Sequence, residues 1–380
     1  MLKVLHLIID QKFLDGAISL FESDSRTDNS YYLIGTPKAS CEFVKYKDIQ
    51  YVSLENVIDL CKQFQVVYLH SLVVLPFKYI VQIPSSIKVV WLAWGYDLYE
   101  NECNYIIPIR VFMPYTQKYL SSKNNRLLQA YKQFKRRVRI DSLINKAIER
   151  IDYFSGVFPY EYDEVCKRHS NFHAKPLDYY YGSTNFFIPE KPEIKLFPKR
   201  NSIIIGNSGN PANNHIDVLE RLNEIKMPED VNIILPMSYG GVLEYNNLVK
   251  DIASKICNGR VNALDHYLPL NDYINIISSC KVAIFGHSRQ QASDNIFMQL
   301  IYGAKVYMSE TSLAYEYLRK LGLIIFSLES DLNKMWEEIS YDDVINNRSI
   351  LSKLYSSSTL INRIKVINDT LINDIDKNDK

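Results

Sequence analysis

The segment from residue 203 to residue 215 constrains the fold of this 380-residue chain more than any other. A run of three isoleucines stops at Gly206, and a loop of small polar residues leads into a helical pattern near His215. This is how an α/β sheet holds a phosphate, because a helix start offers unpaired N–H groups and glycine lets the backbone approach the anion. We expect a phosphorylated ligand, such as a nucleotide derivative, at a set of residues in this segment: Gly206, Asn207, Ser208, Gly209, Asn210 and His215. Asn207, Ser208 and Asn210 are alternatively plain turn and cap residues.

Apolar strands alternate with amphipathic helices through the second half of the chain. The pattern predicts strands at 202–205, 231–235, 261–264, 282–285, 305–308 and 323–326. Helices are expected between them, at 215–225, 244–256, 271–279, 295–302 and 313–321. This alternation is typical of a parallel sheet covered by helices with right-handed crossovers. The first half is similar in kind, with strands expected at 3–9, 31–34, 66–69 and 88–93.

The length predicts two α/β domains. A linker rich in proline and charge is expected at 188–195, which places an N-terminal lobe at 1–190 and a C-terminal lobe at 198–348. Residues 349–380 form a polar tail with helical periodicity, expected to cross back and brace the first lobe. The six cysteines have no CxxC spacing, so we expect free thiols in a cytoplasmic protein. No run reaches the roughly 18 apolar residues that a spanning helix requires.

Polar side chains follow several of the predicted strands of the second half. Ligands bind beyond the carboxyl ends of parallel strands, so we expect these residues to extend the ligand site. They are Ser238, Tyr239, Gly240, Arg289, Gln290, Gln291 and Asn295. Arg289 is suited to pair with a phosphate through two hydrogen bonds, although a surface salt bridge is the alternative.

In the first half, His70 and Asp97 each follow a hydrophobic strand. Asp97 lies among aromatic residues, where the pKa of a carboxylate rises and suits it to act as a general base. The alternative for Asp97 is a helix N-cap, and for His70 a buried core histidine. Trp94 and Tyr96 are candidates to stack on the apolar face of a sugar ring.

The net charge of +1 hides a basic segment between residues 118 and 150. Ten lysines and arginines and two acids give this segment +8. Four of the basic residues, Lys135, Arg136, Arg137 and Arg139, are nearly consecutive, and apolar residues are spaced for one helix face. A basic amphipathic helix indicates contact with an anionic membrane surface. One alternative is a solvated helix face between the domains. Another is a surface that binds nucleic acid, but we expect no nucleic-acid binding.

Five motifs together carry a family resemblance. They are Leu69-His70-Ser71-Leu72, Trp94-Gly95-Tyr96-Asp97-Leu98-Tyr99, Ile205-Gly206-Asn207-Ser208-Gly209-Asn210 with Asn214-His215-Ile216, Pro236-Met237-Ser238-Tyr239-Gly240, and Arg289-Gln290-Gln291. These motifs occur in this order between about residues 66 and 310. In them the chain resembles the bacterial TDP-N-acetylfucosamine:lipid II N-acetylfucosaminyltransferases. It departs from the family pattern at Tyr96 and at Ala292-Ser293-Asp294, near the expected sugar, so the transferred sugar stays open.

The resemblance implies a two-lobed α/β fold of the GT-B type, with Rossmann-like lobes facing each other across a cleft. It implies a nucleotide-diphosphate sugar donor in the C-terminal lobe and a polyprenyl-diphosphate-linked saccharide acceptor at the N-terminal lobe, in surface polysaccharide synthesis. We therefore expect a glycosyltransferase, peripheral on the inner face of the cell membrane, with no cofactor and no metal ion. Asp97 is then the first candidate base and His70 the second. A nucleotide-sugar epimerase of the same architecture and a non-catalytic sugar-nucleotide binding protein remain as alternatives.

Overall fold

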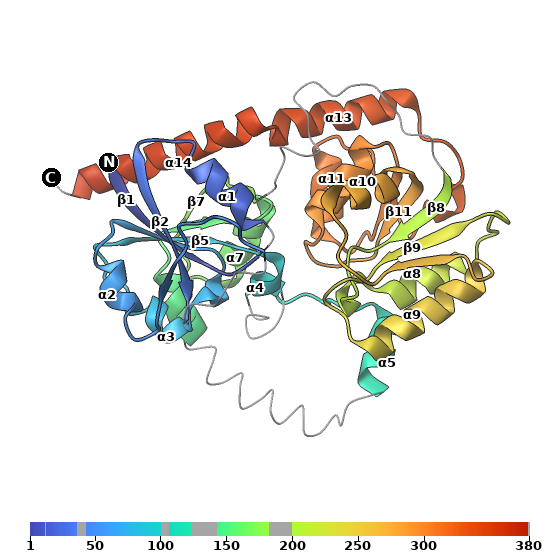
Figure 1. Ribbon diagram of the computed structural model, residues 1–380, viewed down its shortest axis with the longest axis horizontal. Helices are drawn as coiled ribbons and strands as arrows, with labels where there is room; N and C mark the ends of the chain where they lie inside the picture. The colour runs from blue at the N-terminus through green and yellow to red at the C-terminus, as the bar shows by residue number, and fades with distance from the viewer. Residues whose placement is uncertain (12, 36–42, 100–105, 123–142, 182–199, 379–380) are drawn as a thin grey trace. The chain divides into compact units, whose positions relative to one another are not determined.

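The computed structural model describes the chain except for residues 12, 36–42, 100–105, 123–142, 182–199 and 379–380. It divides into two compact units (Figure 1). Unit 1 comprises residues 1–108, 127–186 and 355–380, and unit 2 comprises 109–126 and 187–354. The expected linker at 188–195 lies outside the described residues, as does most of the basic segment.

Unit 1 holds a parallel sheet in the order β3-β2-β1-β4-β5-β6-β7. Its strands are β1 (Leu2–Ile8), β2 (Thr27–Ile34), β3 (Gln50–Val52), β4 (Val66–Leu69), β5 (Lys88–Leu92), β6 (Tyr153–Ser155) and β7 (Lys175–Pro176). The four expected strands of the first half are present. The sequence reading missed β3, β6 and β7, because strands of two or three residues are too short to show a periodicity.

The helices of unit 1 are α1 (Leu14–Phe21), α2 (Val57–Cys61), α3 (Phe77–Ile80), α4 (Gly95–Tyr99), α7 (Tyr160–Arg168) and α14 (Ser357–Asn378). The tail helix α14 packs against α1. It buries Leu360, Ile364, Ile367 and Leu371, the last three in the core formed by β1, β2 and β4. Asp374 of α14 also accepts a hydrogen bond from Tyr153 and pairs with Lys175.

Unit 2 holds a second parallel sheet, in the order β10-β9-β8-β11-β12-β13. Its strands are β8 (Arg200–Ile205), β9 (Asn232–Pro236), β10 (Val261–Leu264), β11 (Cys280–Phe285), β12 (Lys305–Met308) and β13 (Phe326–Ser327). Five match the expected ranges closely. The sixth, expected at 323–326, is displaced toward its carboxyl end: Leu323 and Ile325 are buried, but they lie in an irregular segment that precedes the strand.

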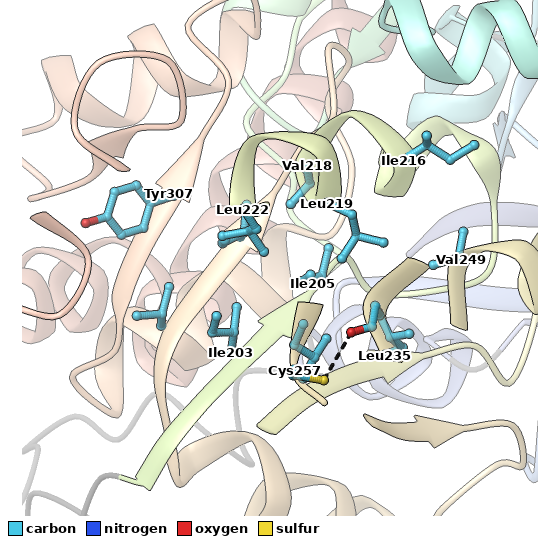
Figure 2. Close-up of a cluster of buried hydrophobic side chains, with 14 of the residues drawn as sticks. Ile203, Ile205, Ile216, Val218, Leu219, Leu222, Leu235, Val249, Cys257 and Tyr307 are labelled. Carbon is cyan, nitrogen blue, oxygen red and sulfur yellow. Dashed lines mark hydrogen bonds between the residues drawn. The ribbon is translucent and has the colours of Figure 1, made fainter. Parts of the chain in front are cut away.

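The helices of unit 2 are α5 (Pro114–Ser122), α8 (His215–Leu222), α9 (Leu243–Ile256), α10 (Leu270–Ser278), α11 (Ser293–Ile301), α12 (Leu313–Lys320) and α13 (Tyr341–Tyr355, which ends at the boundary with unit 1). Figure 2 shows the core between β8, β9 and α8, where Ile203 and Ile205 meet Val218, Leu219 and Leu222. These isoleucines are fully buried, as expected for a central parallel strand covered on both faces.

Candidate functional site

Three neighbouring strands of unit 2 end at the same edge of the sheet. β9, β8 and β11 are adjacent, and all three run parallel. The strand order reverses between β8 and β11, so this is the switch point at which open α/β sheets bind ligands. The loops that follow these strands hold most of the residues expected to bind a phosphorylated ligand.

The loop after β8 is held by Asn213, which the sequence reading did not select. Its amide nitrogen donates to the Ser208 carbonyl (3.0 Å) and hydroxyl (3.1 Å) and to the Asn210 carbonyl (3.0 Å). Its Oδ1 accepts from the Asn207 backbone N–H (3.2 Å) and is 3.1 Å from His287 Nε2. Asn213 therefore ties the β8 loop to the β11 loop. The glycine at 206 adopts φ +69° beside it, and a Cβ there would lie 2.7 Å from the Asn213 Oδ1.

A hydrogen-bonded rim joins the three loops. Asn207 Nδ2 donates to the Tyr239 hydroxyl (3.0 Å), and Gln291 Nε2 donates to Asn207 Oδ1 (2.8 Å). The Gly209 N–H donates to the Tyr239 carbonyl, and Gly240, at φ +77°, lies against Asn210. Ser238 is half-buried in the β9 loop. The structure thus brings together the expected residues from loops that lie about 30 and 80 positions apart in sequence.

Arg289 and Gln290 are largely buried in the β11 loop, at 8% and 5% exposure. Arg289 Nη1 donates to the Gln290 carbonyl (2.9 Å). Burial lowers the pKa of nearby His287 well below its usual range, and the positive charge of Arg289 lowers it further. The imidazole is therefore neutral, and the guanidinium is the cation of this loop.

Asn295, at the start of α11, connects to a tyrosine that the sequence reading missed. Tyr273 of α10 donates to Asn295 Oδ1 at 2.6 Å. Burial raises the pKa of Tyr273, and Tyr239 and Tyr267 act on it electrostatically. Asn295 is therefore held by Tyr273 of the neighbouring helix α10.

The start of α8 differs from the expected open anion site. Asp217 in its first turn accepts from the backbone N–H groups of Tyr115 (2.8 Å) and Thr116 (2.9 Å), and so caps α5. Asn214 accepts from the Met113 N–H (2.9 Å) and donates to the Gly286 carbonyl (2.7 Å). A carboxylate and the α5 segment thus occupy the positive end of α8. The backbone N–H groups of Gly206, Asn207 and Gly209 are also bonded within the unit.

His215 lies beneath the β8 loop, fully buried, with Nδ1 3.3 Å from the Tyr245 hydroxyl. Burial lowers its pKa to about 3, so the ring is neutral. Its Nε2, together with Asn246 Oδ1 and Gln291 Oε1, is buried without a hydrogen-bond partner among the described residues. Buried polar atoms are rarely left unpaired, so three of them around one loop indicate a place where a polar ligand or water binds.

In unit 1, Asp97 is enclosed by the protein. Its Oδ2 accepts from Leu72 N (2.7 Å), Ser71 Oγ (2.9 Å) and Trp91 Nε1 (3.0 Å), and its Oδ1 accepts from Trp94 N (2.6 Å). Burial raises its pKa to about 6, and these donors oppose the rise. The side chain is 0% exposed.

This geometry favours a capping role for Asp97 over the expected general base. The residue is the third of α4, and it reaches back to the N–H that precedes the helix, as in a capping box. The cap therefore comes from inside the helix rather than from the N-cap position.

His70 is also buried, and both its ring nitrogens have partners. Its Nε2 lies 3.0 Å from His6 Nδ1, and its Nδ1 lies 2.9 Å from the Tyr181 hydroxyl. Burial lowers its pKa well below the usual range, so His70 is neutral. The expected sugar-stacking residues Trp94 and Tyr96 are half-buried beside it, and the Trp94 ring lies 4.6 Å from that of Tyr181.

Among the described residues, no three His, Cys, Asp or Glu side chains gather as metal ligands would. The described cysteines, Cys61, Cys166, Cys257 and Cys280, are free thiols, and three of them are buried. Within the described part of the chain, no helix has the length and apolar character to cross a membrane. Of the basic segment, Lys118 lies on α5, while the cluster of Lys135, Arg136, Arg137 and Arg139 lies outside the described residues.

Comparison with solved structures places the fold. The chain is similar to the Anabaena protein HepE in complex with UDP and glucose, at TM-score 0.61 and 11% identity over 98% of this chain and 100% of that one. It is similar to sucrose-phosphate synthase from Thermosynechococcus elongatus at TM-score 0.62 and 8% identity, over 98% and 99% of the two chains. The lipopolysaccharide outer core galactosyltransferase WaaB gives TM-score 0.58 and 9% identity, over 96% and 98%.

These neighbours and the two parallel sheets define the GT-B fold expected from the sequence. Residues 168–336 match the family model described as 4-alpha-L-fucosyltransferase, glycosyl transferase group 56. The chain is a glycosyltransferase, and its residues 168–336 are similar to group 56. That region covers every strand end that forms the rim.

Proposed function

We propose that this enzyme transfers a deoxy-amino sugar, such as N-acetylfucosamine, from a nucleotide-diphosphate donor to a lipid-linked saccharide in surface polysaccharide synthesis. The observation that carries the donor half is the rim of Asn207, Tyr239 and Gln291 at the switch point of unit 2, with the buried Arg289 in the same β11 loop as Gln291. The UDP in the HepE structure and the fucosyltransferase description of group 56 support it.

Arg289 and Ser208 are the groups proposed to act on the leaving diphosphate. A guanidinium pairs with phosphate oxygens through parallel hydrogen bonds, which are stronger than neutral ones. The Ser208 Oγ accepts from Asn213 Nδ2 and the Asn210 N–H, so its own proton is the group left to donate to a phosphate oxygen. Donors fixed before the reaction stabilise the charge that develops on the leaving group. In this proposal the side chains of Arg289 and Ser208, rather than the backbone N–H groups at the start of α8, contact the phosphates.

Trp94 and Tyr96 are proposed to bind the acceptor saccharide in unit 1. Both are half-buried and follow β5 at its carboxyl edge. Asp97 is proposed to act here as a positioning residue, because it holds the Trp94 backbone and the turn at Ser71 and Leu72.

The membrane face is proposed from the sequence of the basic segment. Vesicles with an anionic lipid should bind the full chain at low salt and release it at high salt, because salt screens the attraction. Replacing Lys135, Arg136, Arg137 and Arg139 by serine should abolish flotation with the vesicles. Flotation equal to that of wild type would refute membrane docking through this segment.

The proposed reaction is tested by following the mass of a polyprenyl-diphosphate-linked saccharide incubated with a panel of nucleotide sugars. We expect one sugar residue to be added with one donor, in the presence of a chelator as in its absence. Conversion of the donor to an isomeric nucleotide sugar without an acceptor would instead indicate an epimerase. Donor binding with no turnover of any kind would indicate a non-catalytic binding protein.

A further inference from the structure

A chain of hydrogen bonds runs through the buried part of unit 1 from Asn29 to Tyr181. Asn29 Oδ1 lies 3.2 Å from His6 Nε2, His6 Nδ1 lies 3.0 Å from His70 Nε2, and His70 Nδ1 lies 2.9 Å from the Tyr181 hydroxyl. The two imidazoles are at most 2% exposed and Tyr181 is 9% exposed. Each neutral histidine carries one ring proton, so each donates one hydrogen bond and accepts the other. Which atom donates at every step is therefore set by the end of the hydrogen-bond chain whose orientation is known.

The fixed end is Asn29. Thr27 Oγ1 donates its only proton to the Asp24 carbonyl (3.1 Å), so it accepts from the Asn29 amide nitrogen (3.1 Å). That nitrogen also donates to the Phe21 carbonyl (3.4 Å). The Asn29 oxygen must therefore face His6, and it can only accept a hydrogen bond.

The proton positions follow in sequence. Burial lowers the pKa of His6 to about 3 and that of His70 well below its usual range, so both rings are neutral. His6 carries its proton on Nε2, toward Asn29, which leaves Nδ1 as an acceptor. His70 must then donate from Nε2, which leaves its Nδ1 to accept the proton of the Tyr181 hydroxyl.

We infer that Tyr181 is a specificity-determining residue whose oxygen offers only lone pairs to a ligand, and that it selects an acceptor saccharide by accepting a hydrogen bond from one of its hydroxyl groups. Tyr181 follows β7 by five residues, and its ring packs on Trp94 at the carboxyl edge of the sheet, where the indole N–H also acts on the Tyr181 oxygen as a donor. A site built to bond a substrate hydroxyl discriminates strongly against an analogue without it, because the protein partner is left unpaired. This inference rests on the proposed function.

The direction of the chain is tested without any substrate, by nitrogen-15 NMR of histidine-labelled protein. We expect His6 and His70 to show a protonated Nε2 and an unprotonated Nδ1 at pH 7. Assignment uses His6→Gln and Tyr181→Phe, each of which should shift the His70 signals. A protonated Nδ1 on His70 would overturn the inference, because Tyr181 would then have its own proton free to donate.

Selection of the acceptor is tested with Tyr181→Phe against the matched control Tyr179→Phe. Tyr179 packs edge-on against Tyr181, and its hydroxyl has no hydrogen-bond partner among the described residues. We expect Tyr181→Phe to lower kcat/KM for the acceptor about 10- to 100-fold, with unchanged nucleotide affinity, whereas Tyr179→Phe stays near wild type.

A set of monodeoxy acceptors completes the test. With the wild-type enzyme, one monodeoxy acceptor should show kcat/KM lowered by a similar factor. With Tyr181→Phe, the same acceptor should show no further loss of kcat/KM, since both changes remove the same hydrogen bond. Equal losses in both enzymes would refute the role of Tyr181. If wild type transfers sugar to no lipid-linked acceptor, the proposed function fails instead, and the tautomers decide the hydrogen-bond direction by themselves.

Discussion

Asp97 shows at the scale of one residue how enclosure changes what a carboxylate can do. A raised pKa suits a general base, but a base must also reach the proton that it removes. Among the described residues, the four hydrogen-bond partners of Asp97 are all donors, and they come from three segments of unit 1. The residue therefore joins the ends of β4 and β5.

We predict that Asp97→Asn lowers the free energy of unfolding by about 2–4 kcal/mol. The NH2 group of asparagine would face a hydrogen-bond donor that the carboxylate oxygen now accepts from, and that donor would lose its partner. Chemical denaturation measures this, with Asp59→Asn, which changes an exposed carboxylate, as the control expected near zero. A stably folded Asp97→Asn enzyme with turnover reduced 100-fold and an unchanged KM for the acceptor would favour the general base over the positioning role.

At the scale of elements, the conformation of the loop after β8 depends on the side chain of Asn213. We predict that Asn213→Ala weakens binding of the nucleoside diphosphate at least 10-fold, because it frees the backbone of Asn207, Ser208 and Asn210. Calorimetry with Asn247→Ala, an exposed position on α9, as the matched control measures this. Wild-type affinity in a folded Asn213→Ala protein would show that the loop does not shape the nucleotide site.

The tail helix α14 is an integral element of unit 1. Leu371 is fully buried in the core of β1, β2 and α1, so Leu371→Ala should cost about 2–5 kcal/mol of stability. Val366, on the same helix, is 56% exposed, and Val366→Ala should cost less than about 0.5 kcal/mol. Equal effects of the two changes on urea unfolding would mean that α14 is not part of the core.

The sequence was most informative where local pattern decides the element. Buried runs such as 203–205 predict parallel strands, and the polar residues after those strands were expected to share one edge of the sheet. Whether they bind a donor stays a prediction. Asn213 and Tyr273 escaped prediction because their partners are set by packing between loops and helices, which no local pattern records. His6 escaped for the same reason, since one histidine inside a buried apolar strand carries no sign of its partners. Asp97 was found, but sequence cannot show how many donors surround a carboxylate.

At the scale of the whole molecule, the two units should respond differently to acid. In unit 2, burial lowers the pKa of His215 to about 3 and that of His287 well below its usual range. Their contribution to stability is present above the unfolded pKa, about 6.5, and is lost as the pH falls toward the folded values. In unit 1, His6 and His70 act in the same direction.

Two buried carboxyls oppose the histidines of unit 1. Burial raises the pKa of Asp97 to about 6 and that of Glu161 to about 7, so their contribution is present at low pH and is lost as the pH rises through those values. Near pH 5, the two histidines of unit 1 therefore take up two protons on unfolding while its two carboxyls release two. In unit 2, the two histidines take up two protons and no described group with a raised carboxyl pKa offsets them.

We predict that unit 2 loses about 3 kcal/mol of stability in total between pH 6.5 and 5, while unit 1 changes little. Trp336→Phe leaves Trp91 and Trp94 to report the unfolding of unit 1 by fluorescence, and circular dichroism follows both units. Parallel loss of both signals with falling pH would contradict this account of the buried groups.

The central claim is that a nucleotide-sugar donor binds at the carboxyl edge of β8, β9 and β11. Its most direct test is a calorimetric titration, into Arg289→Ala, of the nucleoside diphosphate that wild type binds, with UDP as the first probe. The account predicts a Kd about 10- to 100-fold weaker than that of wild type, because a charge-assisted pair with the diphosphate is lost. Arg319→Ala, which removes a guanidinium from α12 of the same unit, should bind UDP as wild type does. Wild-type affinity for UDP in a folded Arg289→Ala protein would contradict the claim.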